Sequence, residues 1–141
     1  MELRRATPDD AELVLQFWKD SGASMSTTDE VEYVRRVTQN SAAIFLLAVA
    51  EGEIVGSILG TFDGWRGNIY RLVVRPSHRR HGVGRQLVRQ VEKTFSEWGV
   101  RRITVLVEID RPSAMEFWSA VGYPRDEHIV RHVRMLDSST A

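Results

Sequence analysis

Residues 79–84 read RRHGVG and lie between an apolar run that ends at Val74 and an amphipathic stretch from Gln86 to Trp98. This pattern predicts a strand that passes through a glycine-containing turn into a helix. The first N–H groups of such a helix have no intrahelical partner, and glycine lets an anion approach them closely. The stretch therefore predicts a cradle for phosphate groups, and with it a nucleotide-like cofactor.

Positive charge is concentrated around this turn. The interval from Arg71 to Arg89 holds six arginines, two histidines and no acidic residue, whereas the whole chain balances 19 basic against 19 acidic residues. In a chain without net charge, such a local cluster fits a small polyanion better than a nucleic-acid duplex. The ordinary alternative is a solvated, charged face at the start of a helix.

Length and composition predict one globular domain, residues 1–141. Hydrophobic residues make up 43% of the chain and charged residues 27%, which is typical of a soluble protein with no overall field for nucleic acid or a membrane. The charged N-terminus lacks a signal core and no apolar run approaches a membrane span, so we expect a cytoplasmic protein. The absence of cysteine excludes disulfides, thiolate metal ligands and a cysteine nucleophile.

Hydrophobic periodicity predicts an α+β chain with a three-layer arrangement, in which a mixed, mostly antiparallel, twisted sheet is flanked by about four helices. Turn residues at Glu51-Gly52-Glu53 and between Asp63 and Gly67 predict two hairpins. The expected strands are 3–6, 42–50, 54–62, 69–74 and 102–109, with a last β-like segment at 128–136. The expected helices begin at Thr7 and at about Thr28, and follow at 86–98 and 112–121.

Residues 74–84 read VRPSHRRHGVG. This stretch resembles the acetyl-CoA signature of the GNAT superfamily of N-acetyltransferases, V-x-P-x-x-[RQ]-x-x-G-x-[GA], at every defined position. Residues 114–123, AMEFWSAVGY, are similar to the second block, A-x-x-[FL]-[YF]-x-x-x-G-[FY]. The resemblance covers nearly the whole chain and, through the 62–67 turn and the length, is strongest to the small YpeA-type acetyltransferases. It implies the GNAT fold and acetyl-CoA-dependent acetylation of a primary amine.

The resemblance also implies cofactor roles. On a strand that splays from its neighbour, the backbone of Leu72, Val73 and Val74 would pair with the pantetheine arm, and the Val74 N–H would stabilise the oxyanion of the thioester. Side chains of Arg79, Arg80 and Arg85 would neutralise phosphates. The pyrophosphate would be wrapped by the N–H groups of Arg79, Arg80, His81, Gly82, Val83 and Gly84.

The chain departs from the family at both expected proton-transfer positions. Tyr70 stands where many relatives carry a glutamate base, and a phenol is a poor base at neutral pH, so Tyr70 is expected to position a water or the amine; an ordinary strand aromatic is the alternative. Strand alternation places Arg71 on the opposite face, so that only one of the two lines the cleft. Trp118 stands where relatives carry a tyrosine acid, and an indole cannot supply a proton. The thiolate would leave as such or take a proton from water.

Other candidates have structural explanations as well. Asp63 and Glu108 are the remaining carboxylates that could reach the cleft, and they also suit a turn and a strand end. Arg111 replaces an asparagine that often contacts the cofactor in relatives. On a strand, His128 and His132 would lie about 13 Å apart and could not share an ion, so we expect no metal.

The sequence leaves the acceptor open between a small-molecule amine and a protein N-terminus or lysine. Trp65, at a polar turn, is the candidate for acceptor binding, and Met25 is a further lining candidate; Phe17 and Trp18 fit a helix core better. The expected partners are acetyl-CoA and an amine, without nucleic acid or a membrane, in a monomer or homodimer. A non-catalytic CoA-binding module is the alternative function, because the usual glutamate and tyrosine are replaced.

Overall fold

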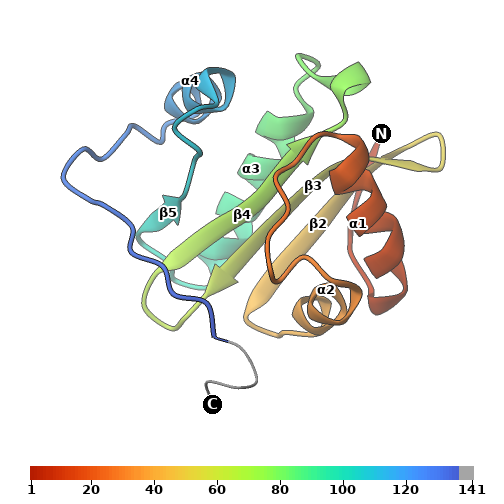
Figure 1. Ribbon diagram of the computed structural model, residues 1–141, viewed down its shortest axis with the longest axis horizontal. Helices are drawn as coiled ribbons and strands as arrows, with labels where there is room; N and C mark the ends of the chain where they lie inside the picture. The colour runs from red at the N-terminus through yellow and green to blue at the C-terminus, as the bar shows by residue number, and fades with distance from the viewer. Residues whose placement is uncertain (137–141) are drawn as a thin grey trace. The chain divides into compact units, whose positions relative to one another are not determined.

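The computed structural model describes residues 1–136, which divide into two compact units, residues 1–106 and a second unit that begins at Val107. The first unit holds a five-stranded sheet in the order β1-β2-β3-β4-β5. All neighbouring strands are antiparallel except β4 and β5, which are parallel (Figure 1). The mixed, mostly antiparallel sheet predicted from the sequence is confirmed. Its elements are β1 (Glu2–Arg5), α1 (Ala11–Asp20), α2 (Val31–Thr38), β2 (Ala43–Ala50), β3 (Glu53–Phe62), β4 (Gly67–Val74), α3 (Val83–Glu97) and β5 (Ile103–Val105).

Helices cover both faces of this sheet. On one face, α1 and α2 bury an apolar cluster that includes Phe17, Trp18, Phe45 and Leu47, as helical spacing predicts for the first two. On the other face, α3 packs closely: a Cβ at Gly60 would lie 2.8 Å from Phe95 Cζ. Glycines of β3 and β4 therefore let α3 approach the sheet and fix where its N-terminus lies.

The two hairpin turns form where the sequence predicts them. Glu51 and Gly52 join β2 to β3 with φ angles of 51° and 78°, the left-handed pair that matches strand twist in a two-residue turn. In the next turn the Asp63 carboxylate accepts the N–H groups of Trp65 at 2.8 Å and Arg66 at 2.7 Å. Hydrogen bonds from the Arg66 and Trp65 N–H groups lower the pKa of Asp63. Its carboxylate is thus engaged as a turn former.

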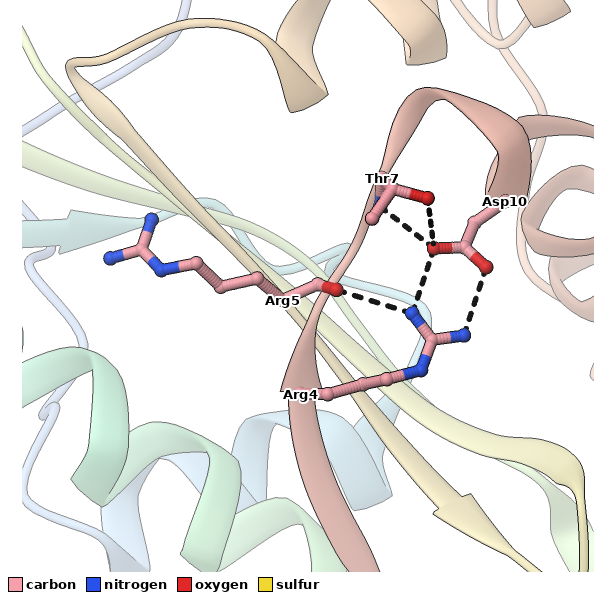
Figure 2. A network of polar contacts seen from close by, with 4 residues as sticks. All are labelled: Arg4, Arg5, Thr7 and Asp10. Carbon is pink, nitrogen blue, oxygen red and sulfur yellow. Dashed lines mark hydrogen bonds and ion pairs between the residues drawn. The ribbon is translucent and has the colours of Figure 1, made fainter.

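The start of α1 is held by a polar network (Figure 2). A 3₁₀ turn (η1, Pro8–Asp10) precedes the helix, and Asp10 accepts the Thr7 N–H at 2.7 Å. Both oxygens of Asp10 also accept from the Arg4 guanidinium, at 2.8 and 2.9 Å, in a bidentate pair. The network ties β1 to the 3₁₀ turn. The α-helix begins at Ala11, whereas the sequence predicted that it begins directly after Thr7.

Two further predicted boundaries are corrected. Helix α2 begins at Val31 and not near Thr28, because Asp29 is engaged in other contacts described below. Strand β5 ends at Val105 instead of continuing to Ile109, because its pairing with β4 stops at Ile69. A strand is stable only where a neighbour takes up its backbone hydrogen bonds, so periodicity alone overestimated the length of β5.

A further 3₁₀ turn, η2 (Pro76–His78), precedes residues 79–84, which we call the phosphate turn.

The second unit contains α4 (Pro112–Ala120), close to its predicted position. Trp118 is 6% exposed and makes edge-to-face contacts with Phe117 and Tyr123, at ring centroid distances of 5.3 and 5.1 Å. The β-like segment predicted at 128–136 is wrong: these residues form no strand, and their apolar side chains are exposed. No helix between residues 1 and 136 is long and apolar enough to cross a bilayer.

Candidate active site

A β-bulge interrupts β4 at the centre of the first unit. Leu59 of β3 pairs with Tyr70, but Ser57 pairs with Val73, so β4 contains one extra residue between these two pairs. Arg71, within the bulge, has a left-handed φ of 54°. This conformation is costly for a residue with a side chain, and strained backbone of this kind is concentrated at functional sites.

The bulge places Tyr70 and Arg71 on the same face of the sheet. Tyr70 pairs with Leu59, which packs in the cluster under α1 and α2. The Arg71 guanidinium reaches the same side, where it lies 4.9 Å from the centre of the Trp18 ring. The expectation that Arg71 faces away from Tyr70 is therefore wrong, because the extra residue breaks the alternation of the strand. Tyr70 is 44% exposed and available to a ligand.

A buried hydrogen-bond chain supports the bulge. The Trp18 indole N–H donates to Ser57 Oγ at 2.9 Å, and that hydroxyl donates to the Arg71 carbonyl at 2.8 Å. Ser57 is fully buried. Sequence reasoning missed Ser57, although a serine within the apolar run 54–59 of β3 is the signal that could have identified it. Trp18 is thus a supporting residue and not a lining residue.

Beyond the bulge, β4 has an edge that β5 does not cover. The parallel ladder ends with the pair Ile69 and Val105. The Arg75 N–H donates to Val55 of β3 at 2.8 Å. Because backbone groups alternate along a strand, the Val74 N–H is directed to the opposite edge, where β5 has separated from β4. This is the splayed strand that the sequence motif implies.

The phosphate turn leads from β4 to the N-terminus of α3. Arg80 and Gly82 have φ angles of 64° and 83°, and a Cβ at Gly82 would meet no atom within 4 Å. Gly82 is the N-cap residue and no side chain caps the helix. The Gln86 N–H makes the first intrahelical bond, to the Gly82 carbonyl at 3.0 Å. The preceding N–H groups of the first turn have no intrahelical partner and therefore suit an anion.

The arginines of the turn divide into two kinds. Arg79 donates from Nε to the Val74 carbonyl at 3.0 Å and from its terminal nitrogen to the Ser21 carbonyl at 3.1 Å. Its side chain is thus already hydrogen-bonded to protein backbone. Arg80 and Arg85 are exposed and form no ion pair with any residue in the range 1–136. They are the two guanidinium groups that the fold leaves available beside the helix start.

The remaining candidate residues come from separate segments of the chain. Trp65 is 73% exposed, with the Arg66 guanidinium 4.0 Å above its ring. Glu108, in the second unit, forms an ion pair with Arg111 at 3.3 Å. Met25 is exposed in the segment between α1 and α2. Within residues 1–136, no three histidine or acidic side chains lie close enough to hold a metal ion, and His128 and His132 do not lie on a strand.

Comparison with known proteins identifies the family. Residues 11–123 match the acetyltransferase (GNAT) family. An acetyltransferase of Pectobacterium atrosepticum is 29% identical over 137 residues, which cover 97% of each chain. An aminoglycoside 6'-N-acetyltransferase from Acinetobacter haemolyticus has a similar structure, with a TM-score of 0.80, 18% identity and coverage of 97% of this chain and all of the other.

A PaiA N-acetyltransferase from Thermoplasma acidophilum, solved with coenzyme A, gives a TM-score of 0.79 at 18% identity, over 86% of this chain and 87% of the other. The family match spans the bulged strand, the phosphate turn and α4. This chain therefore belongs to the GNAT family of acetyltransferases, the enzymes that use acetyl-CoA as their acyl donor.

Proposed function

We propose that this chain transfers the acetyl group of acetyl-CoA to a primary amine, which attacks the thioester directly in a ternary complex. The observation that carries the proposal is that the uncovered edge of β4 at Val74 is followed in the chain by the N-terminus of α3, which no side chain caps. The first offers backbone hydrogen bonds to an extended arm, and the second offers N–H groups and a positive dipole end to phosphates. Acetyl-CoA carries both an extended arm and a pyrophosphate.

The cofactor residues follow from this arrangement. The backbone of Leu72, Val73 and Val74 binds the pantetheine arm, and the Val74 N–H donates to the thioester oxygen as it gains negative charge. The exposed guanidinium groups of Arg80 and Arg85 neutralise phosphates. The Arg79 side chain instead orients the turn, since it is bonded to Val74 and Ser21. The pyrophosphate is held by N–H groups from residues Arg79, Arg80, His81, Gly82, Val83 and Gly84.

On the amine side, Tyr70 orients the attacking amine or a water that accepts its proton. Strand β4 carries no carboxylate, and Asp63 is engaged in its turn. The amine must lose a proton, and solvent can accept it once the tetrahedral intermediate has formed. The CoA thiolate then leaves and takes a proton from water. Trp65 is the proposed contact for the body of the acceptor.

The proposed acceptor is a small-molecule amine or the N-terminus or a lysine of a protein. A structural neighbour from a soil metagenomic sample is an aminoglycoside acetyltransferase in complex with sisomicin, at 17% identity and a TM-score of 0.74. Sisomicin therefore belongs in a test panel with spermidine, free amino acids and peptides with a free N-terminus. Each is incubated with acetyl-CoA, and released CoA is measured with a thiol reagent.

A second candidate is a non-catalytic CoA-binding module. It is favoured by the absence of a carboxylate on β4 and by Trp118, which packs between Phe117 and Tyr123 and cannot supply a proton. Calorimetry with acetyl-CoA separates the two candidates when it is combined with the panel. Binding together with amine-dependent CoA release supports the transferase, and binding without release on any amine supports the module.

A further inference from the structure

The segment between α1 and α2, residues 21–30, is attached at one end to the turn that follows β4 and at the other end to β4 itself. At its start, the Ser21 carbonyl accepts a hydrogen bond from Arg79, at 3.1 Å. Near its end, the Asp29 carboxylate forms an ion pair with Arg71 of the β4 bulge. Arg71 and Arg79, which are distant in sequence from residues 21–30, thus hold both ends of this segment.

The Asp29–Arg71 ion pair is well shielded from water. The Asp29 side chain is 8% exposed and that of Arg71 is 19% exposed. Asp29 also accepts from the Ser26 N–H at 2.7 Å and from Ser26 Oγ at 3.1 Å. The Arg71 guanidinium lies 4.9 Å from the centre of the Trp18 ring. A buried pair with further hydrogen bonds is costly to break, because removal of one partner leaves the other charge uncompensated.

The ion pair bears directly on the β4 bulge, because Arg71 lies within it. Its backbone has a left-handed φ, where glycine or asparagine would be less strained. Its carbonyl receives the Ser57 hydroxyl, so one residue joins the bulge to the core and the 21–30 segment to the bulge. Tyr70 precedes it on the same face of the sheet. The segment that Arg71 holds therefore lies on the side of β4 where the proposed acceptor amine meets Tyr70.

Resting on the proposed acetyl transfer, we propose that Arg71 is a positioning residue whose ion pair with Asp29 holds the 21–30 segment against the β4 bulge and so shapes the acceptor side of the site. Arg71 does not touch the acceptor in this role. The donor side depends on the edge of β4 that β5 leaves uncovered and on the start of α3. The Arg71 side chain instead contacts Asp29 and Trp18.

The test uses Asp29→Asn, Arg71→Met and the double variant, because Asn and Met keep side-chain size while removing charge. Glu12→Gln is the matched control: it breaks the exposed Arg35–Glu12 pair, 3.9 Å between α1 and α2, and leaves the bulge untouched. Arg71→Lys retains the positive charge and provides the conservative rescue. Amide hydrogen exchange of residues 21–30 is measured for each variant, together with KM for acetyl-CoA and for the panel amine with the fastest turnover.

We expect exchange in residues 21–30 to accelerate by about tenfold in both single variants and in the double variant, with no change in β2. KM for the amine should rise by about tenfold in all three, while KM for acetyl-CoA stays within about twofold. Glu12→Gln should match the wild type, and Arg71→Lys should fall between wild type and Arg71→Met.

Three results would overturn the positioning role. The first is exchange in residues 21–30 that does not change in Asp29→Asn. The second is a rise in amine KM that is much larger for Arg71→Met than for Asp29→Asn, which would mean that Arg71 contacts the acceptor directly. The third is an effect on acetyl-CoA alone. If no amine in the panel is acetylated, the proposed function fails, and hydrogen exchange still decides whether the ion pair holds the segment.

Discussion

Asp10 predicts a defined acid sensitivity of the fold. The hydrogen bonds from Arg4, with a smaller contribution from Thr7, lower the pKa of Asp10 from its usual 3.8 to about 2. Because the folded state favours the ionised carboxylate, its contribution is complete above the unfolded pKa and is lost as the pH falls from about 4 through 2. The difference between these two pKa values corresponds to about 2–3 kcal/mol at 1.36 kcal/mol per pKa unit. Partial exposure of Arg4, at 38%, reduces this to about 2 kcal/mol.

The assay is urea unfolding of the wild type and Asp10→Asn at a series of pH values from 7 to 2. At pH 7 we expect the variant to be less stable by about 2 kcal/mol, and the difference should shrink toward zero near pH 2. Asp9→Asn, which neutralises the exposed neighbour at the same helix start, controls for charge alone. A difference between wild type and Asp10→Asn that stays constant down to pH 2 would refute the assignment of this energy to the Arg4–Asp10 pair.

Three further predictions concern packing and the site. Gly60→Ala places a Cβ 2.8 Å from Phe95 Cζ and should destabilise the fold by about 1–3 kcal/mol in urea, an effect that Phe95→Leu should partly relieve; additive losses would contradict the close approach. Ser57→Ala leaves the buried Trp18 N–H without its acceptor and should cost about 1–3 kcal/mol, whereas a neutral result would mean that the chain to Arg71 does not support the bulge. Tyr70→Phe should lower amine turnover more than acetyl-CoA affinity, measured by CoA release and calorimetry, and an unchanged rate would reduce Tyr70 to a scaffold residue.

Local sequence signals predicted much of the fold. The Glu51-Gly52 turn, the Asp63 turn and the α3 stripe from Val83 to Phe95 lie where pattern and turn chemistry place them. Each depends on residues that are close together in the chain. The phosphate turn belongs to the same class, because a motif of eleven residues, 74–84, contains both the strand end and the helix start.

Features that depend on distant partners could not be predicted in this way. The bulge at Arg71 is supported by Ser57 and Trp18, which approach only in the folded sheet, so alternation placed the Arg71 side chain on the wrong face. The late start of α2 reflects Asp29, whose partner lies 42 residues away. Pairing also determined the length of β5 and the absence of a strand in residues 128–136, since an alternating pattern does not supply a neighbouring strand.

The most direct test of acetyl-CoA binding at the start of α3 is calorimetry with the Gly84→Leu variant. Leucine in the first turn of α3 should fill the space that the pyrophosphate needs, while Gln90→Leu introduces the same side chain at an exposed position farther along the same helix. We expect acetyl-CoA binding to be lost in Gly84→Leu and retained in Gln90→Leu, with both variants folded by circular dichroism. Wild-type affinity in a folded Gly84→Leu variant would contradict the placement of the cofactor.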